Sequence, residues 1–295
     1  MINGIINVYK EAGYTSFDVV AKLRKITHQK KIGHTGTLDP DATGVLPVCF
    51  GNATKLVDLM TDKRKEYIAT MVLGKTTDTY DISGQVLEEK TVNCTVDDVT
   101  ATINEFVGDI MQVPPMYSAL KVDGKKLCDL AREGKTVERK ARPVTIFAIE
   151  ILDVDLPNIK MRVECSKGTY IRSLCYDIGL RLGCGGTMTS LIRTRSGAFD
   201  IEHAYKLSQI EEYVNSDSVN DIVLNVDAVF EDYAYATVSG ETLRLCRNGN
   251  TLSKSMLQVI PGKDNTKVRI YDDNGTFFAV YELKGSYYGV YKMFL

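Results

Sequence analysis

One segment, residues 31–47, restricts the fold of this chain more than any other. It reads KIGHTGTLDPDATGVLP and combines three glycines and two prolines with one histidine and two carboxylates. Glycine admits backbone angles that other residues avoid and proline fixes its own, so the segment is predicted to form a shaped loop, followed by an apolar strand over residues 45–51. A carboxylate held on such a loop, Asp39 or Asp41, is a candidate for chemistry. The alternative is a turn with a solvated aspartate.

The composition limits the class of protein. With 295 residues the chain is long enough for one large domain or two, and it has no apolar run of the length that a membrane span needs. Residues 1–10 are typical of a strand and not of a signal peptide. Seven scattered cysteines without a Cys-x-x-Cys pair favour reduced thiols in the cytoplasm, and three histidines without ligand spacing predict no metal site.

Charge is unevenly distributed although the net charge is only −2. Residues 22–31 carry five Lys or Arg and no acid, whereas the local charge is +4 over residues 121–142, +5 over 160–195 and −8 over 196–235. Because salt screens each patch beyond about 10 Å, such a chain can bind a polyanion through local patches. Charge alone fits solvated charged faces equally well.

The predicted elements alternate irregularly. A strand over residues 4–10 precedes a helix that starts after the capping box TSFD and runs to about residue 28. The other elements expected are helices near residues 53–61, 96–106, 170–182 and 207–215, a strand over 66–74, a polar loop over 76–84, and an antiparallel pair over 144–154 and 159–166. This order predicts an α+β or mixed α/β fold. Turn signals after about residue 234 predict a small β-rich domain of short strands.

Four segments together resemble the TruB family of tRNA pseudouridine synthases. They are GHTGTLDP at residues 33–40, KEY at 65–67, MYSALKVDGKK at 116–126 and CSKGTYIRSL at 165–174. The resemblance implies an α+β fold with a mixed, largely antiparallel central sheet and a PUA-like C-terminal domain. It divides the chain into a catalytic domain at residues 1–232, with an RNA-gripping insertion at about 114–142, and an RNA-binding domain at 233–295.

The resemblance implies isomerisation of the uridine at position 55 in the tRNA T loop, without cofactor or metal. A carboxylate suits this reaction as a nucleophile on ribose C1′, as a base at C2′ or as a partner for oxocarbenium-like charge. The family motifs assign this role to Asp39, the adjacent cation to Arg172 and the ring that stacks on the flipped base to Tyr67. Viewed alone, Arg172 would be a helix-surface cation near Asp177, and Tyr67 a core residue.

Further residues are expected to bind the substrate. Tyr170 and Leu191 match positions that line the uracil pocket, although Leu191 alone would be read as core. His34 matches a residue that contacts the RNA near the flipped nucleotide, and its alternative role is a proton partner for Asp39. Phosphate contacts are expected from three cations of the insertion, which are Lys121, Arg132 and Arg142.

Two other function classes stay open at this level. One is an RNA-folding module that reshapes tRNA without catalysis, a role that could coexist with the enzyme. The other is a nucleoside hydrolase built on Asp39 and Asp41. The expected partner is the T stem-loop of tRNA, with no membrane, no obligatory protein partner, a monomeric state and a cytoplasmic location.

Overall fold

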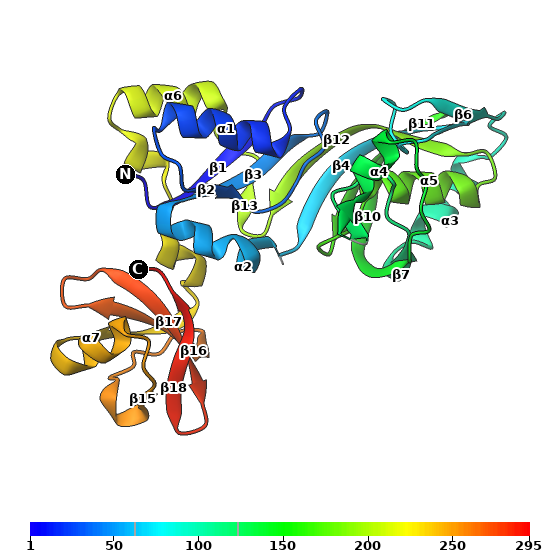
Figure 1. The fold of residues 1–295 in the computed structure, drawn as a ribbon. Helices are drawn as coiled ribbons and strands as arrows, with labels where there is room; N and C mark the ends of the chain where they lie inside the picture. Colours follow the sequence, from blue (N-terminus) through cyan, green and yellow to red (C-terminus); the bar gives the residue numbers. More distant parts are fainter. Residues whose placement is uncertain (62, 123) are drawn as a thin grey trace.

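The computed structural model describes residues 1–61, 63–122 and 124–295. In this part of the chain nine strands form one mixed sheet (Figure 1). The strand order is β1 (Gly4–Lys10), β3 (Thr43–Phe50), β12 (Gly186–Ser196), β4 (Lys65–Leu73), β11 (Asn158–Cys165), β10 (Arg142–Asp155) and β7 (Gly108–Gln112), with β2 (Ile32–His34) on β3 and β13 (Phe199–Asp200) on β12. Among these pairs only β3 and β12 are parallel, which confirms the largely antiparallel sheet.

Four helices cover one face of this sheet. Alternate residues of β4 are buried, as expected for a strand with one covered face. The helices α1 (Ser16–Ile26) and α6 (Leu207–Asn215) pack on β1 and β3, while α3 (Val96–Asn104) and α5 (Ile171–Arg181) pack on β4, β11 and β12. The capping box at Thr15 and Asp18 starts α1 as predicted, and burial of Val19, Val20 and Leu23 docks it on the sheet.

The C-terminal part of the chain has its own core. Its five-stranded sheet has the order β14 (Tyr233–Val238), β16 (Asp264–Asp272), β17 (Phe277–Lys284), β18 (Tyr287–Met293) and β15 (Leu252–Ser253). Phe294 and Val280 of this part pack with Ile5, Cys49 and residues near α2 (Val57–Thr61), so the small domain contacts the sheet face opposite to α1. The predicted β-rich domain is therefore present.

Several local predictions were incomplete. The helix near residues 53–61 is a 3-10 helix over Gly51–Leu56 followed by the single α-helical turn of α2. Residues 31–47 are not all loop, because β2 and the start of β3 lie within them. The strands β7 and β12 and the helix α7 (Gly240–Arg247) were missed. Two short ladders, β5 (Lys75–Thr77) with β6 (Val86–Glu89) and β8 (Lys121–Val122) with β9 (Lys125–Lys126), lie outside the main sheet.

The insertion folds around a small apolar cluster of its own. Its helix α4 (Leu127–Arg132) contributes Leu127 and Leu130, which pack against Met116 and are separated from the main core. This cluster holds the loop that carries Tyr117 next to the N-terminus of α5. The insertion is thus a compact lobe beside α5 (Figure 1).

Candidate active site

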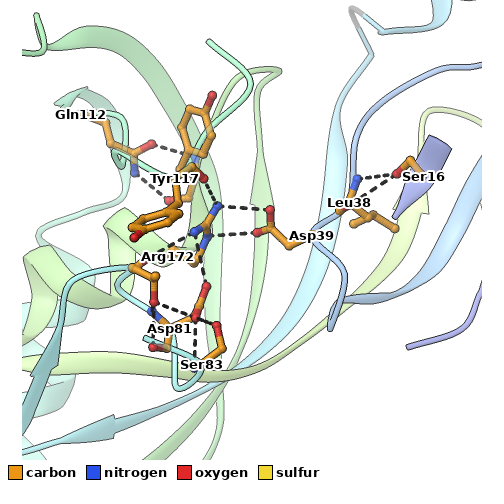
Figure 2. A network of polar contacts seen from close by, with 10 residues as sticks. Ser16, Leu38, Asp39, Asp81, Ser83, Gln112, Tyr117 and Arg172 are labelled. Atoms are coloured by element: carbon orange, nitrogen blue, oxygen red, sulfur yellow. Dashed lines mark hydrogen bonds and ion pairs between the residues drawn. The ribbon is translucent and has the colours of Figure 1, made fainter. Parts of the chain in front are cut away.

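An ion pair joins the loop that carries Asp39 to the first turn of α5 (Figure 2). Arg172 Nε lies 2.9 Å from Asp39 Oδ2, and Arg172 Nη2 donates to Asp39 Oδ1 at 3.1 Å. This two-point geometry fixes the plane of the carboxylate as well as its position. The arginine side chain is 5% exposed and the aspartate side chain 38%, so the cation is hidden while the carboxylate stays accessible.

The remaining donors of Arg172 bind two other loops. Its Nη1 donates to the Thr79 carbonyl and to Asp81 Oδ2, at 3.2 and 3.3 Å, and its Nη2 donates to the Tyr117 carbonyl at 2.7 Å. Asp81 in turn accepts hydrogen bonds from the Thr79 hydroxyl and from Ser83. Arg172 therefore connects the Asp39 loop, the polar loop over residues 76–84 and the insertion (Figure 2).

Two buried cations hold the Asp39 loop by its backbone. Lys10, fully buried at the end of β1, donates to the carbonyls of Pro40 and Ala42 at 2.8 and 2.6 Å. Arg193, 1% exposed on β12, donates to the carbonyls of Gly36 and Val45 at 3.2 and 2.7 Å. A loop cannot be buried with unpaired carbonyls, and these side chains satisfy them where no ladder can.

Further contacts set the position of the loop. Ser16 in the first turn of α1 accepts a hydrogen bond from the Leu38 backbone N–H at 2.9 Å (Figure 2). Gly44 has φ +104°, and a Cβ there would lie 2.2 Å from the Arg193 carbonyl, so only glycine allows β3 to pass β12 this closely. Asp39 is thus presented by a loop that is fixed on both sides.

Burial and neighbouring charges act in opposite directions on Asp39. Burial raises the pKa of its carboxyl above the usual value, the Arg172 guanidinium opposes that rise, and the charge of Asp81 adds to it. Burial also lowers the pKa of Lys10 to about 8, against the attraction of Asp39 and Asp41. Asp41 itself is exposed. The geometry therefore favours Asp39 over Asp41 as the positioned carboxylate.

Tyr67 and Leu191 lie on neighbouring strands beside the Asp39 loop. Tyr67 is opposite Arg193 in the pairing of β4 with β12, and Leu191 is opposite Ala69, so both side chains point to the face that α5 covers. They are 7% and 8% exposed and belong to the main apolar cluster. Burial raises the pKa of the Tyr67 hydroxyl and the Arg193 charge opposes this, with a smaller contribution from Asp39.

His34 ends β2 and is only partly exposed. Its Nδ1 accepts a hydrogen bond from the Gly36 N–H at 3.4 Å. Burial lowers the pKa of the imidazole and the Arg193 charge lowers it further, so the neutral form of the ring is favoured. A neutral ring with one nitrogen occupied suits contact with a nucleotide better than proton exchange with Asp39.

Tyr170 is held at the N-terminus of α5 by its backbone. Gln112 accepts from the Tyr170 N–H at 2.8 Å and donates to its carbonyl at 3.0 Å, and this glutamine is 2% exposed. A helix start leaves its N–H groups without partners, and Gln112 supplies one for the Tyr170 N–H. The Tyr170 carbonyl also accepts from the Leu174 N–H at 3.1 Å, so both Gln112 hydrogen bonds add to those within α5. They also connect β7, at the base of the insertion, to the turn that carries Arg172.

The three predicted phosphate contacts all lie on the exposed surface of the insertion or at its base. Lys121 is on β8, Arg142 begins β10, and the Arg132 side chain at the end of α4 is 74% exposed. Arg132 lies 3.6 Å from Asp129. None of the three contacts Asp39 in the part of the chain that the structure describes.

Sequence reasoning missed four residues that organise this site. Asp81, Lys10, Arg193 and Gln112 are connected to Asp39 or Arg172 by contacts between segments far apart in the chain. The sequence signal for Arg193 was limited to Leu191 and Ile192 before it, and Lys10 stands between Tyr9 and Glu11 at a strand end. The reading of Arg172 as a surface cation near Asp177 is wrong, since Arg172 is buried and paired with Asp39 and Asp81.

The described residues also bear on metal binding, membrane insertion and cysteine chemistry. No three His, Cys, Asp or Glu side chains there are close enough together to hold a metal ion. No helix over residues 1–61, 63–122 and 124–295 has the length and apolar character to cross a membrane. All seven cysteines are free thiols.

Two family models together match most of the chain. The model described as "TruB family pseudouridylate synthase (N terminal domain)" matches residues 24–171. The model described as "tRNA pseudouridylate synthase B C-terminal domain" matches residues 172–231. The Asp39 loop lies in the first match, and Arg172 is the first residue of the second.

Curated relatives align over nearly the whole length. A protein of Clostridium novyi named tRNA pseudouridine synthase B is 51% identical over 280 residues, which are 95% of each chain. A protein of the same name from Lachnoclostridium phytofermentans is 50% identical over 307 residues, and the alignment covers 100% of each chain. A third, from Clostridium acetobutylicum, is 45% identical and covers 99% of each.

Solved structures agree with this grouping. The chain resembles one in the crystal structure of a Cbf5-Nop10-Gar1 complex, with a TM-score of 0.74, 28% identity, and coverage of 99% of this chain and 85% of that one. It also resembles one in the structure of an H/ACA RNP bound to a substrate RNA containing 2′-deoxyuridine, with a TM-score of 0.73, 26% identity and the same coverage.

Proposed function

Because the chain belongs to the TruB family of pseudouridine synthases, we propose that it isomerises the uridine at position 55 in the tRNA T loop, with Asp39 as the nucleophile. Relatives named tRNA pseudouridine synthase B support tRNA as the substrate. The observation that carries the choice of Asp39 is its two-point pairing with buried Arg172 on a loop fixed by Lys10 and Arg193.

The proposed reaction exchanges one glycosidic bond for another. Asp39 attacks ribose C1′ and the bond from C1′ to uracil N1 breaks, with its electron pair leaving on the base. The base turns, C5 attacks C1′ and the bond to Asp39 breaks. The proton on C5 is then lost and N1 gains one, so the product is an isomer of the substrate and no oxidant or group donor is needed.

Each neighbouring group has a part in this proposal. The Arg172 guanidinium opposes the rise in the pKa of Asp39 that burial causes, and so favours the ionised nucleophile. The Tyr67 ring stacks on the flipped base, which offsets part of the unstacking cost of a few kcal/mol. Tyr170 and Leu191 line the uracil pocket, and His34 contacts the RNA next to the flipped nucleotide.

The proposed RNA contacts use the insertion and the C-terminal domain. Lys121, Arg132 and Arg142 bind phosphates of the T arm, because they are exposed cations on the lobe that Tyr117 joins to the site. Residues 1–232 form the catalytic domain and residues 233–295 an RNA-binding domain. The enzyme acts in the cytoplasm as a monomer without an obligatory protein partner, cofactor or metal.

The variant Asp39→Asn tests the nucleophile. It keeps the size of the side chain and removes the charge, so pseudouridine formation in a tRNA transcript is expected to fall below detection while tRNA binding persists. Asp41→Asn is the matched control, since Asp41 is two residues away and exposed, and it is expected to keep wild-type activity. Full activity of Asp39→Asn would refute the role of Asp39. Release of free uracil by the wild type would favour a hydrolase.

A role in tRNA folding is a separate part of the proposal. The insertion has its own apolar cluster, which does not depend on Asp39. We therefore expect Asp39→Asn to refold misfolded tRNA as well as the wild type does. Loss of folding activity together with isomerisation would show that folding depends on catalysis.

A further inference from the structure

The basic run at residues 22–31 is not used by the site described above. It contributes the second half of α1 and the turn that follows, and its five cations are exposed: Lys22, Arg24, Lys25, Lys30 and Lys31. Cations in the last turn of a helix interact favourably with the helix dipole, which explains the presence of Arg24 and Lys25 there. It does not explain Lys22, within the helix, or Lys30 and Lys31, beyond it.

These five cations differ from several surface arginines by their partners. Arg64, Arg162, Arg181 and Arg244 each lie within 4 Å of a carboxylate. Among the described residues, none of the five cations of the run has such a partner, and their contacts are to neutral groups. Lys22 lies over the Tyr14 ring at 4.5 Å, Arg24 donates to the Lys30 carbonyl, and Lys31 donates to Asn52.

Sheet register places this helix on the same side as the site. Tyr67 is opposite Arg193, and Arg193 is opposite Gly44, so these three residues point to one face. Two residues further along β3, Leu46 points the same way and packs with α1, whereas Tyr67 packs with α5. The helices α1 and α5 therefore cover the same face of the sheet.

The Asp39 loop adjoins the N-terminal end of α1. Ser16 binds the Leu38 backbone, and the Gly13 N–H donates to the Pro40 carbonyl at 3.0 Å. From this contact the eleven-residue helix extends about 16 Å. A shallow groove of about 240 Å³, lined by Tyr14, Asp18, Ala21, Lys22 and Lys25, runs along its outer side.

The neighbouring helix limits the direction that a bound polyanion can take. The helix α6 packs beside α1 through the shared apolar cluster, and its Glu211 and Glu212 are exposed. Phosphates are repelled by these carboxylates and attracted to the lysines of α1. The favoured track runs along α1 toward the Asp39 loop, with the cations of the insertion on the far side of the site.

We propose that the α1 track, defined as Lys22, Arg24, Lys25, Lys30 and Lys31, binds the sugar–phosphate backbone of the tRNA outside the T loop. This inference rests on the proposed function, because the RNA is the same molecule whose uridine is at Asp39. The contact is electrostatic and independent of sequence. It gives the enzyme a second binding surface for the substrate, separate from the insertion.

The test compares two triple variants of equal charge change. Lys22→Gln/Lys25→Gln/Lys30→Gln removes three cations of the α1 track and keeps side-chain length and helix propensity. Arg64→Gln/Lys160→Gln/Arg162→Gln is the control. Lys160 and Arg162 are opposite Thr70 and Ile68, on the face away from α1, and Arg64 contacts Glu164 on that same face. Melting temperatures of both variants are compared with the wild type to confirm folding.

Binding is measured with a whole tRNA transcript and with an isolated T arm, at several salt concentrations. The affinity of the α1-track variant for whole tRNA is expected to be lower than that of the wild type by a factor of about ten or more at 0.1 M salt. The slope of log K against log salt concentration is expected to be shallower by about 0.9 for each lost phosphate contact. The control is expected to keep wild-type affinity and slope. At saturating tRNA the turnover number of the α1-track variant is expected to be unchanged.

Binding to the two RNAs, together with the activity of the wild type, distinguishes failure of the α1-track inference from failure of the proposed function. A loss for whole tRNA alone supports a contact beyond the T arm, and a loss for both RNAs supports a contact on the T stem. Equal affinity of the α1-track variant and the wild type for both RNAs overturns the inference. So does an equal loss in the control variant. If the wild type binds tRNA but forms no pseudouridine, the proposed function fails, and the binding comparison still decides whether the α1 track holds RNA.

Discussion

Replacing Arg172 by methionine removes the cation that joins three loops at the candidate site. The guanidinium makes two contacts with Asp39, one with Asp81 and two with the carbonyls of Thr79 and Tyr117. Methionine fills similar space without charge or donors. Asp39 and Asp81 then lie near each other without the guanidinium, and the pKa of Asp39 rises because only the smaller effect of the Lys10 charge still opposes burial.

The magnitude follows from the burial of the pair. Removing one partner of a buried ion pair costs about 3–5 kcal/mol. Arg172 is 5% exposed, but water reaches the 38%-exposed Asp39 carboxylate and recovers part of this loss, so about 3 kcal/mol is expected. If the same interaction is made in the transition state, the rate falls about 100-fold or more.

The same helix supplies a matched control. Arg181 ends α5 and pairs with Glu105 at 2.8 Å, but the two side chains are 63% and 53% exposed. Arg181→Met is therefore expected to cost less than about 1 kcal/mol and to leave the rate unchanged. Activity is measured as tritium release from tRNA labelled at uridine C5, since that hydrogen is lost when C5 bonds to ribose. Arg172→Met with activity within tenfold of the wild type would refute this reasoning.

Three other perturbations have expected outcomes. Asp177 is half-buried, and burial raises its pKa from 3.8 to about 6. The folded state therefore favours the protonated carboxyl, and the free energy of unfolding falls as the pH rises from about 3.8 through 6. Asp177→Asn should therefore raise the free energy of unfolding by at most about 3 kcal/mol at pH 7, and a gain that persists at pH 3 would contradict this. Lys10→Met should lower the turnover number more than tenfold, because the Pro40 and Ala42 carbonyls lose their hydrogen-bond donor. An unchanged turnover number would show that these hydrogen bonds are not needed to position the Asp39 loop. Lys121, Arg132 and Arg142 replaced by Ala should make the salt dependence of tRNA binding shallower by about 2–3 without changing turnover at saturation, and an unaltered slope would remove these cations from the RNA interface.

The sequence predicted the elements whose signals are local. The helix α1 begins at its capping box, and β10 and β11 pair around Leu156 and Pro157 as expected. By contrast, β12 was missed because only Met188, Leu191 and Ile192 of its eleven residues are large and apolar, and Arg193 is buried only because distant carbonyls accept its hydrogen bonds. The helix α7 was missed because its sequence is short and polar.

The candidate site was predictable only in part for the same reason. The loop offered Asp39 and Asp41 as candidates, and the family resemblance selected Asp39. The pairing of Asp39 with Arg172 joins residues 133 apart in sequence, and only the same resemblance suggested it. Asp81 lies in a segment predicted simply as a polar loop, and its contact with Arg172 spans 91 residues. The packing of the sheet decides which polar side chains come together, and the spacing of residues along the sequence does not reveal it.

The most direct test of the account is to locate the product. Wild-type protein is incubated with an unmodified tRNA transcript, and pseudouridine is mapped at nucleotide resolution. One modified nucleotide is expected, at position 55 in the T loop. Absence of pseudouridine, or its appearance only at other positions, would contradict it.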